Sequence, residues 1–221
     1  MTIDTVLFDF DGTLLNSNEL IAQSHLYVLD HYYPGVYNRT SVRQFNGPPL
    51  SSVYERLDPL RAEDMMARYR SFGHDKHDEW VSLFPDVVAT LAQLRRAGKK
   101  IAIVSTKRNH ILDRGLDLFA LRDHVDVVIG GSDCLLHKPD PEPIHKALAA
   151  LGSEPATSIM VGDNWQDIAS AHNAGVKSVF VAWSEKTLHD LLPHTPDFMV
   201  HSMAELGDWV CHSSPQPPSS T

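Results

Sequence analysis

Short apolar runs recur along the chain, and a cluster of polar residues lies at or beyond the end of each run. The first run covers residues 6–8, and similar runs cover residues 101–104, 125–129 and 158–161. Continuous apolar runs of this length are typical of strands that are buried on both faces. Helical patterns separate the runs, which favours parallel pairing through right-handed crossovers. The pattern predicts an α/β fold whose core is a doubly wound, parallel, Rossmann-like sheet.

The segment from about residue 15 to residue 83 departs from this alternation. It has no strong strand pattern, and apolar residues such as Leu20, Ile21 and Val28 fall at helical spacing. The alternation of strands and helices resumes near Phe84. We therefore expect a discontinuous α/β core of residues 1–14 and 84–210, and a helical cap of residues 15–83. The Ser- and Pro-rich residues 211–221 are expected to form a disordered tail.

Four polar clusters follow the predicted strands, at residues 9–13, 105–106, 138–141 and 162–167. They should meet in one crevice, because open parallel sheets bind ligands outside the carboxyl ends of their strands. Each cluster alone has an ordinary explanation, such as helix capping by Ser105 and Thr106 or a turn at Asp163. The ordered set of four is a much stronger signal than any one member.

The first cluster places Asp9 and Asp11 where a buried strand ends, and buried carboxylates destabilise a protein unless a partner such as a cation offsets them. An EF-hand calcium loop also opens with Asp-x-Asp. However, Gly12 stands at loop position 4 instead of 6, and Leu20 stands where the bidentate Glu belongs. Two capping aspartates without chemistry remain the alternative at this point.

The residue types in the four clusters suit phosphoryl transfer, which needs a nucleophile, charge neutralisation and a proton for the leaving group. Asp9 is the candidate nucleophile and would form an aspartyl-phosphate, whereas Asp11 can protonate the leaving oxygen. Lys138 can aim its ammonium at the phosphate and at Asp9. Asp167 lies one helical turn past Asp163 and is expected to orient Lys138 or a metal-bound water. The candidate phosphate-binding residues of the core are Gly12, Thr13, Ser105 and Thr106.

This set of motifs resembles the haloacid dehalogenase superfamily of phosphatases. The superfamily pattern is Asp-x-Asp-Gly-Thr, a Ser or Thr after a strand, a loop Lys, and Gly-Asp-x-x-x-Asp. The chain shows it at residues 9–13, Ser105, Lys138 and residues 162–167, with Thr106 where many members carry Asn. The resemblance implies that Asp9, the backbone carbonyl of Asp11 and Asp163 bind Mg²⁺. It also implies that residues 15–83 form a mobile cap.

Segments outside these motifs resemble one branch of the superfamily, the PpaX-type bacterial inorganic pyrophosphatases. Examples are Gly-Pro-Pro-Leu at residues 47–50 and Pro-Asp-Phe-Met at residues 196–199, whereas residues 130–134 do not look family-like. The resemblance implies hydrolysis of pyrophosphate. A small phosphomonoester such as 2-phosphoglycolate is the alternative substrate, and a phosphate-binding module without turnover is the alternative from another class.

The leaving group should be selected by the cap, since the core clusters contact only the transferred phosphoryl group. Gly47 and the two prolines after it form the candidate substrate loop, and Arg43 is the nearest candidate cation. A helix-connecting turn with a surface Arg is the plain alternative. His74 and His77 have the spacing of a transition-metal pair, although chance proximity is common among thirteen histidines. Lys107 and Arg108 are interpreted as a solvated helix start, with the steering of anions as the alternative.

The composition of the chain excludes some classes of binding partner. A net charge of −9 argues against nucleic acid and anionic membranes, and no apolar stretch approaches a membrane span. The two cysteines, Cys134 and Cys211, lie far apart and suggest reduced thiols. Together these features predict a cytoplasmic enzyme that acts on pyrophosphate or a small phosphorylated molecule. They leave its oligomeric state open.

Overall fold

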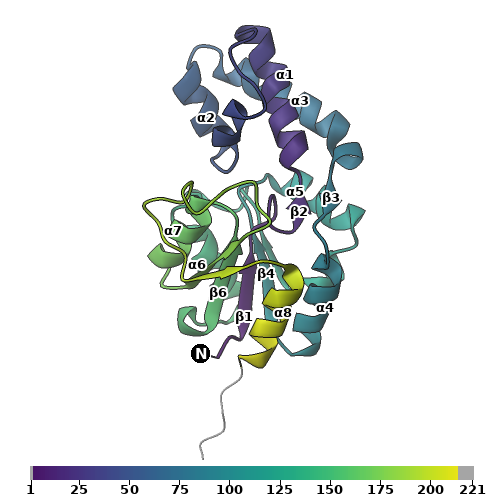
Figure 1. The fold of residues 1–221 in the computed structure, drawn as a ribbon, viewed down its shortest axis with the longest axis vertical. Coiled ribbons are helices and arrows are strands. Elements are labelled where there is room, and N and C mark those ends of the chain that lie inside the picture. Colours follow the sequence, from purple (N-terminus) through teal and green to yellow (C-terminus); the bar gives the residue numbers. More distant parts are fainter. Residues whose placement is uncertain (1, 214–221) are drawn as a thin grey trace, which may run out of the picture. The chain divides into compact units, whose positions relative to one another are not determined.

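The computed structural model describes residues 2–213, and Figure 1 shows their helices and strands. Leu15–Leu83 forms one compact unit, and the described residues on either side of it form the other. We call these two units the cap and the core. None of the described helices combines the length and the apolar composition that crossing a membrane requires.

The core contains a six-stranded sheet in the order β5-β4-β1-β6-β7-β8, in which all neighbouring strands run parallel. Its strands are β1 Thr5–Phe8, β4 Lys100–Val104, β5 Val127–Ile129, β6 Ser158–Gly162, β7 Lys177–Val181 and β8 Phe198–Val200. Its helices are α4 Val87–Arg96, α5 Asn109–Leu118, α6 Glu142–Leu151, α7 Trp165–Asn173 and α8 Met203–His212, with 3-10 turns η2 Arg122–His124 and η3 Pro155–Thr157. This architecture confirms the predicted Rossmann-like α/β fold.

Helices cover both faces of the core sheet. Helices α6 and α7 pack on one face, and α4 and α8, which contact each other, lie on the other face (Figure 1). The strands are mostly apolar because both faces of the sheet are covered. All four side chains of β1 are buried, for example, and Leu7 joins Val104, Ile144 and Met160 in one apolar cluster.

The cap is helical, with α1 Asn18–Tyr32, the 3-10 turn η1 Ser41–Phe45, α2 Leu50–Leu57 and α3 Ala62–Trp80. Two short strands that the sequence did not predict, β2 Leu15–Asn16 and β3 Ser82–Leu83, pair antiparallel at the ends of the insertion. The cap has its own apolar core, in which Tyr54 and Met65 are fully buried between α1, α2 and α3.

The predicted start of the disordered tail at Cys211 is wrong. Helix α8 continues through Cys211 to His212, because Val210 is fully buried and keeps the last turn packed on the core. The Ser213 hydroxyl also donates to the carbonyl of Trp209 at 2.7 Å and caps that turn. Residues 214–221 of the predicted tail lie outside the described residues.

Candidate active site

The register of the sheet brings the ends of three strands to one edge. In β1, Phe8 pairs with Ile103 of β4 on one side and with Val161 of β6 on the other. The ladder continues one residue further, since the Asp9 N–H donates to the Val161 carbonyl at 2.8 Å. Polar residues that follow these strands therefore start from neighbouring positions, as expected for a parallel sheet.

Lys138 lies at the centre of this edge. Its ammonium donates to Asp9 Oδ1 at 2.8 Å, to Asp167 Oδ1 at 2.6 Å and to the Val104 carbonyl at 2.9 Å. The three contacts use all three donors of the ammonium, and all these groups are buried. Burial alone would lower the pKa of Lys138, but attraction to Asp167 and Asp9 outweighs it and raises the pKa. Lys138 is therefore held in place as a cation.

Asp167 is fixed from two sides. One carboxylate oxygen receives Lys138, and the other accepts the N–H of Asn164 at 3.0 Å as half of a capping box at the start of α7. Gly162 makes this approach possible, because a Cβ at that position would lie 2.4 Å from the Asp167 Cγ. The sequence expectation that Asp167 faces the same crevice as Asp163 agrees with this placement.

Three carboxylates crowd together next to Lys138. Asp9, Asp163 and Asp167 each offer one oxygen, and these oxygens lie within 4.8 Å of one another. Burial raises the pKa of Asp9 from 3.8 to about 7. The charge of Lys138 lowers this pKa, and the charge of Asp167 raises it further. Burial and the charges of Asp9 and Asp167 also raise the pKa of Asp163 well above its usual value. One lysine does not offset three buried carboxylates, so the cluster favours a cation.

Asp163 is the carboxylate best placed to receive that cation. Its Oδ2 accepts a hydrogen bond from the Ser184 hydroxyl at 3.0 Å, and it forms no ion pair within residues 2–213. It also packs closely on Gly12, whose φ of +84° suits glycine and where a Cβ would lie 2.4 Å from Asp163 Oδ2. Buried, hard oxygen donors with excess negative charge are the ligands that Mg²⁺ and similar divalent cations prefer.

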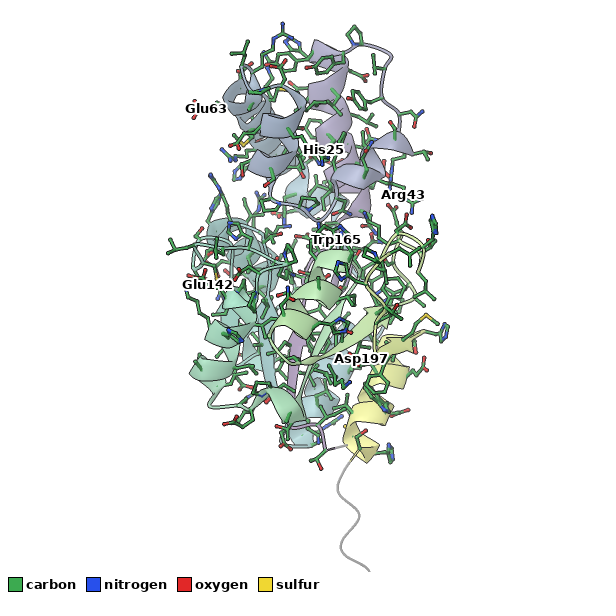
Figure 2. All side chains as sticks on the ribbon, turned by 90° about the vertical axis from the view of Figure 1, so that its left-hand side faces the viewer. His25, Arg43, Glu63, Glu142, Trp165 and Asp197 are labelled. Carbon is green, nitrogen blue, oxygen red and sulfur yellow. The ribbon has the colours of Figure 1, made fainter. Side chains whose placement is uncertain are left out.

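A loop after β7 supports this side of the site, and the sequence analysis missed it. Besides Ser184, the loop carries Trp183, whose indole N–H donates to the Thr13 carbonyl at 3.1 Å. Trp165 at the start of α7 (Figure 2) stacks on His194 at the far end of the loop, with ring centroids 5.6 Å apart. The sequence gives no signal for these contacts, because no strand-end cluster marks the loop.

The Asp11 carboxylate pairs with Lys107, a residue that the sequence analysis placed in solvent. The Lys107 ammonium lies 2.6 Å from Asp11 Oδ1 and 2.9 Å from Oδ2, and the Lys107 side chain is only 14% exposed. The interpretation of Lys107 as part of a solvated helix start is therefore wrong. Lys107 lies in the turn between β4 and α5, which begins at Asn109, and Asp11 gives its ammonium an ion-pair partner there. The Asp11 carboxylate does not belong to the cluster of Asp9, Asp163 and Asp167. The backbone carbonyl of Asp11 stays the predicted Mg²⁺ ligand at this residue.

The predicted phosphate-binding residues of the core are close to the same edge. Ser105 is buried, and its Oγ accepts the N–H of Lys107 at 3.2 Å. Thr106 is half-buried in the turn before α5. Thr13 is fully buried, and its Oγ1 has no hydrogen-bond partner among the described residues. A hydroxyl in that position is ready to bind a ligand oxygen.

The cap candidates belong to the other unit and stay predictions. Arg43 is half-buried in η1 (Figure 2), and Gly47, with φ of +119°, lies in the turn before α2. His77 is buried and its Nδ1 lies 2.8 Å from Asp78 Oδ1. Within the part of the chain that is described, the acidic cluster of the core is the one candidate metal group, and it includes neither His74 nor His77.

The profile of the haloacid dehalogenase-like hydrolases matches residues 6–181, which include all four clusters of the core. The chain belongs to this family. The predicted superfamily resemblance is thereby confirmed, and so is the prediction of a phosphate-hydrolysing enzyme over a binding module without turnover.

Relatives within the haloacid dehalogenase-like hydrolases bear out the finer resemblance as well. The chain is 45% identical to the pyrophosphatase PpaX of Bacillus pumilus, over 93% of this chain and 95% of the relative. It is 44% identical to the PpaX of Anoxybacillus flavithermus, over 93% of this chain and 96% of the relative.

A solved structure supports the assignment of the fold. The putative haloacid dehalogenase-like hydrolase of Bacteroides fragilis superimposes with a TM-score of 0.86 at 27% identity, over 93% of this chain and all of that one. The chain is thus a hydrolase of this family over nearly its whole length.

Proposed function

We propose that this hydrolase is a Mg²⁺-dependent inorganic pyrophosphatase that forms an aspartyl-phosphate on Asp9. The observation that carries the proposal is the buried arrangement in which Lys138 joins Asp9 and Asp167 beside Asp163, a carboxylate that forms no ion pair within residues 2–213. The preference for pyrophosphate over other phosphates rests on the names of the PpaX relatives, which match 93% of the chain.

The proposed first step forms a bond between an Asp9 oxygen and phosphorus and breaks the bond to the leaving phosphate. Lys138 holds Asp9 Oδ1, so the second oxygen is the one that attacks, and the ammonium lies close to the transferred phosphoryl group. Asp11 gives its proton to the leaving oxygen. In the second step a water attacks the phosphorus of the aspartyl-phosphate and gives a proton to Asp11. The bond between phosphorus and the Asp9 oxygen breaks, which releases phosphate and restores the Asp9 carboxylate.

The proposed Mg²⁺ site consists of Asp9, Asp163 and the backbone carbonyl of Asp11. When bound, the cation would supply positive charge to the phosphoryl oxygens, which lets an anionic nucleophile approach an anionic substrate. Asp167 is the less available carboxylate of the cluster, because one oxygen is bonded to Lys138 and the other caps α7. We therefore assign Asp167 to the positioning of Lys138. Gly12, Thr13, Ser105 and Thr106 are assigned to the phosphoryl oxygens.

A comparison of kcat/KM for pyrophosphate and for a panel of phosphomonoesters tests the substrate. The panel includes 2-phosphoglycolate, the alternative substrate of the sequence analysis. A clear preference for pyrophosphate is the expected result. Preference for 2-phosphoglycolate would overturn the substrate while leaving the phosphatase chemistry in place. No turnover of any phosphate in the presence of Mg²⁺ would overturn the proposed function itself.

A further inference from the structure

The ion pair between Lys107 and Asp11 has no part in the proposed chemistry so far. It joins residues that are 96 positions apart and leaves both side chains mostly buried, with 14% of Lys107 and 18% of Asp11 exposed. The ammonium also lies 5.9 Å from the centre of the Phe10 ring, the residue between the two aspartates. Two oxygens of one carboxylate thus share one ammonium in a confined space, which fixes the direction of that carboxylate.

The backbone of Lys107 is itself clamped. Its carbonyl accepts the N–H of Gly131 at 2.8 Å, and a Cβ on Gly131 would lie 2.4 Å from the Thr106 carbonyl oxygen. A Cβ on Gly130 would lie 2.3 Å from Asn109 Oδ1. The two glycines therefore let the loop after β5 pack directly on the turn that carries Lys107. This gives a physical role to residues 130–131, which do not resemble the family pattern.

Lys138 does not compete with Lys107 for the Asp11 carboxylate. The ammonium of Lys138 already uses its three donors on Asp9, Asp167 and the Val104 carbonyl. Arg108 is exposed to solvent beside Lys107. A free carboxylate on a surface loop samples several rotamers, whereas one held by a mostly buried ammonium keeps a single orientation.

We propose that Lys107 is a positioning residue that aims the Asp11 carboxylate at the leaving-group oxygen. The inference rests on the proposed role of Asp11 as the group that protonates that oxygen. Lys107 transfers no proton. One oxygen of Asp11 keeps the ammonium while the other carries the proton that passes to the leaving oxygen as the phosphorus–oxygen bond breaks.

The dependence of the rate on the leaving group distinguishes this role from a structural one. A good leaving group such as para-nitrophenolate departs without a proton, whereas phenolate is more basic and gains from protonation. Loss of a well-aimed acid therefore slows phenyl phosphate more than para-nitrophenyl phosphate. A variant that merely loosens the fold lowers both rates by the same factor.

The test measures kcat/KM on these two aryl phosphates for the full chain with Mg²⁺ and for five variants. The variants are Lys107→Met, Lys107→Arg, Asp11→Asn, the double variant Asp11→Asn/Lys107→Met, and Arg108→Met as the control. Lys107→Met should lower the ratio of the phenyl rate to the para-nitrophenyl rate roughly tenfold, and Lys107→Arg should restore part of it. Arg108→Met removes the same charge from the neighbouring position and should leave the ratio unchanged.

The double variant decides whether Lys107 acts through Asp11. In the Asp11→Asn background, Lys107→Met should cause no further change in the ratio, because the carboxylate it aims is gone. Equal slowing of both substrates by Lys107→Met, or the same tenfold change in both backgrounds, would overturn the inference. If Asp11→Asn itself leaves the ratio unchanged, the proposed role of Asp11 fails and the inference fails with it. If Lys107→Met does not fold, Lys107→Arg against Asp11→Asn gives the same comparison.

Discussion

The carboxylate that we assign as nucleophile should destabilise the protein when no cation is bound. Asp9 is buried next to two other acids, and its pKa rises from 3.8 to about 7, chiefly because of burial. The substitution Asp9→Asn keeps the shape of the side chain and removes the charge. We expect a variant that is inactive, because an amide cannot form the aspartyl-phosphate, and more stable than the original chain in the absence of divalent cations.

The sign of the pH dependence follows from the two pKa values. The unfolded chain releases the Asp9 proton near pH 3.8 and the folded protein near pH 7, so between these values the folded protein binds more protons. Its free energy of unfolding therefore falls as the pH rises through this window. At about 1.4 kcal/mol per pKa unit, the loss grows by on the order of 3 kcal/mol from pH 5 to pH 8.

The Asp9→Asn variant escapes this loss because its amide does not ionise. Lys138 keeps Asp167 and the Val104 carbonyl as partners, and the amide oxygen can still accept its third donor. The gap between the melting temperatures of variant and original chain should therefore widen by roughly 6–12 °C between pH 5 and pH 8.

Calorimetry or fluorescence melting in chelator-treated buffer at several pH values measures this gap. Asp123→Asn is the matched control, since the same chemical change at an exposed aspartate of the core should leave the gap flat. Addition of Mg²⁺ should raise the melting temperature of the original chain more than that of Asp9→Asn. A gap that stays constant or narrows as the pH rises would refute the argument, and so would turnover by the purified variant.

Three further predictions concern the metal, the cap and acid stability. Chelation should stop turnover and Mg²⁺ should restore it. Ca²⁺ should be a poor substitute, because it takes more ligands at longer distances than Mg²⁺ does. Unchanged rates after exhaustive chelation would contradict this prediction. Arg43→Ala should lower kcat/KM for pyrophosphate roughly tenfold more than for para-nitrophenyl phosphate, because the leaving group of the latter carries no second phosphate. Equal losses on the two substrates would show that Arg43 does not contact the leaving group. His25 is buried in the cap beside the Tyr54 hydroxyl at 3.0 Å, and burial lowers its pKa from 6.5 to about 3. The unfolded chain alone binds that proton, so the cap should lose on the order of 2 kcal/mol of stability as the pH falls from 7 to 5. Hydrogen exchange in the cap should show this loss of stability. The substitution His25→Gln should abolish the loss, whereas His31→Gln, at an exposed histidine, should leave it in place.

The sequence alone determined the fold class and the edge of the sheet at which the site forms. Buried strands need apolar residues on both faces, so each strand appears as a run that can be read without coordinates. Because the strands run parallel, polar residues that follow them start from one edge, and this argument placed Asp9, Lys138, Asp163 and Asp167 near one another. The structure brings these four side chains together as that argument expected.

Only the tertiary structure decided what each of these groups touches. The pairing of Lys107 with Asp11, the support of Asp163 by Ser184, and the packing of Gly131 on the turn before α5 all depend on loop conformations. Loops follow no periodic pattern, and their contacts join residues far apart in the sequence, so composition and spacing do not reveal them. The strand-end motifs could be read from the sequence because a repeating backbone geometry positions them. The charge partners that tune those motifs could not, because side chains from separate loops meet only after the sheet has formed.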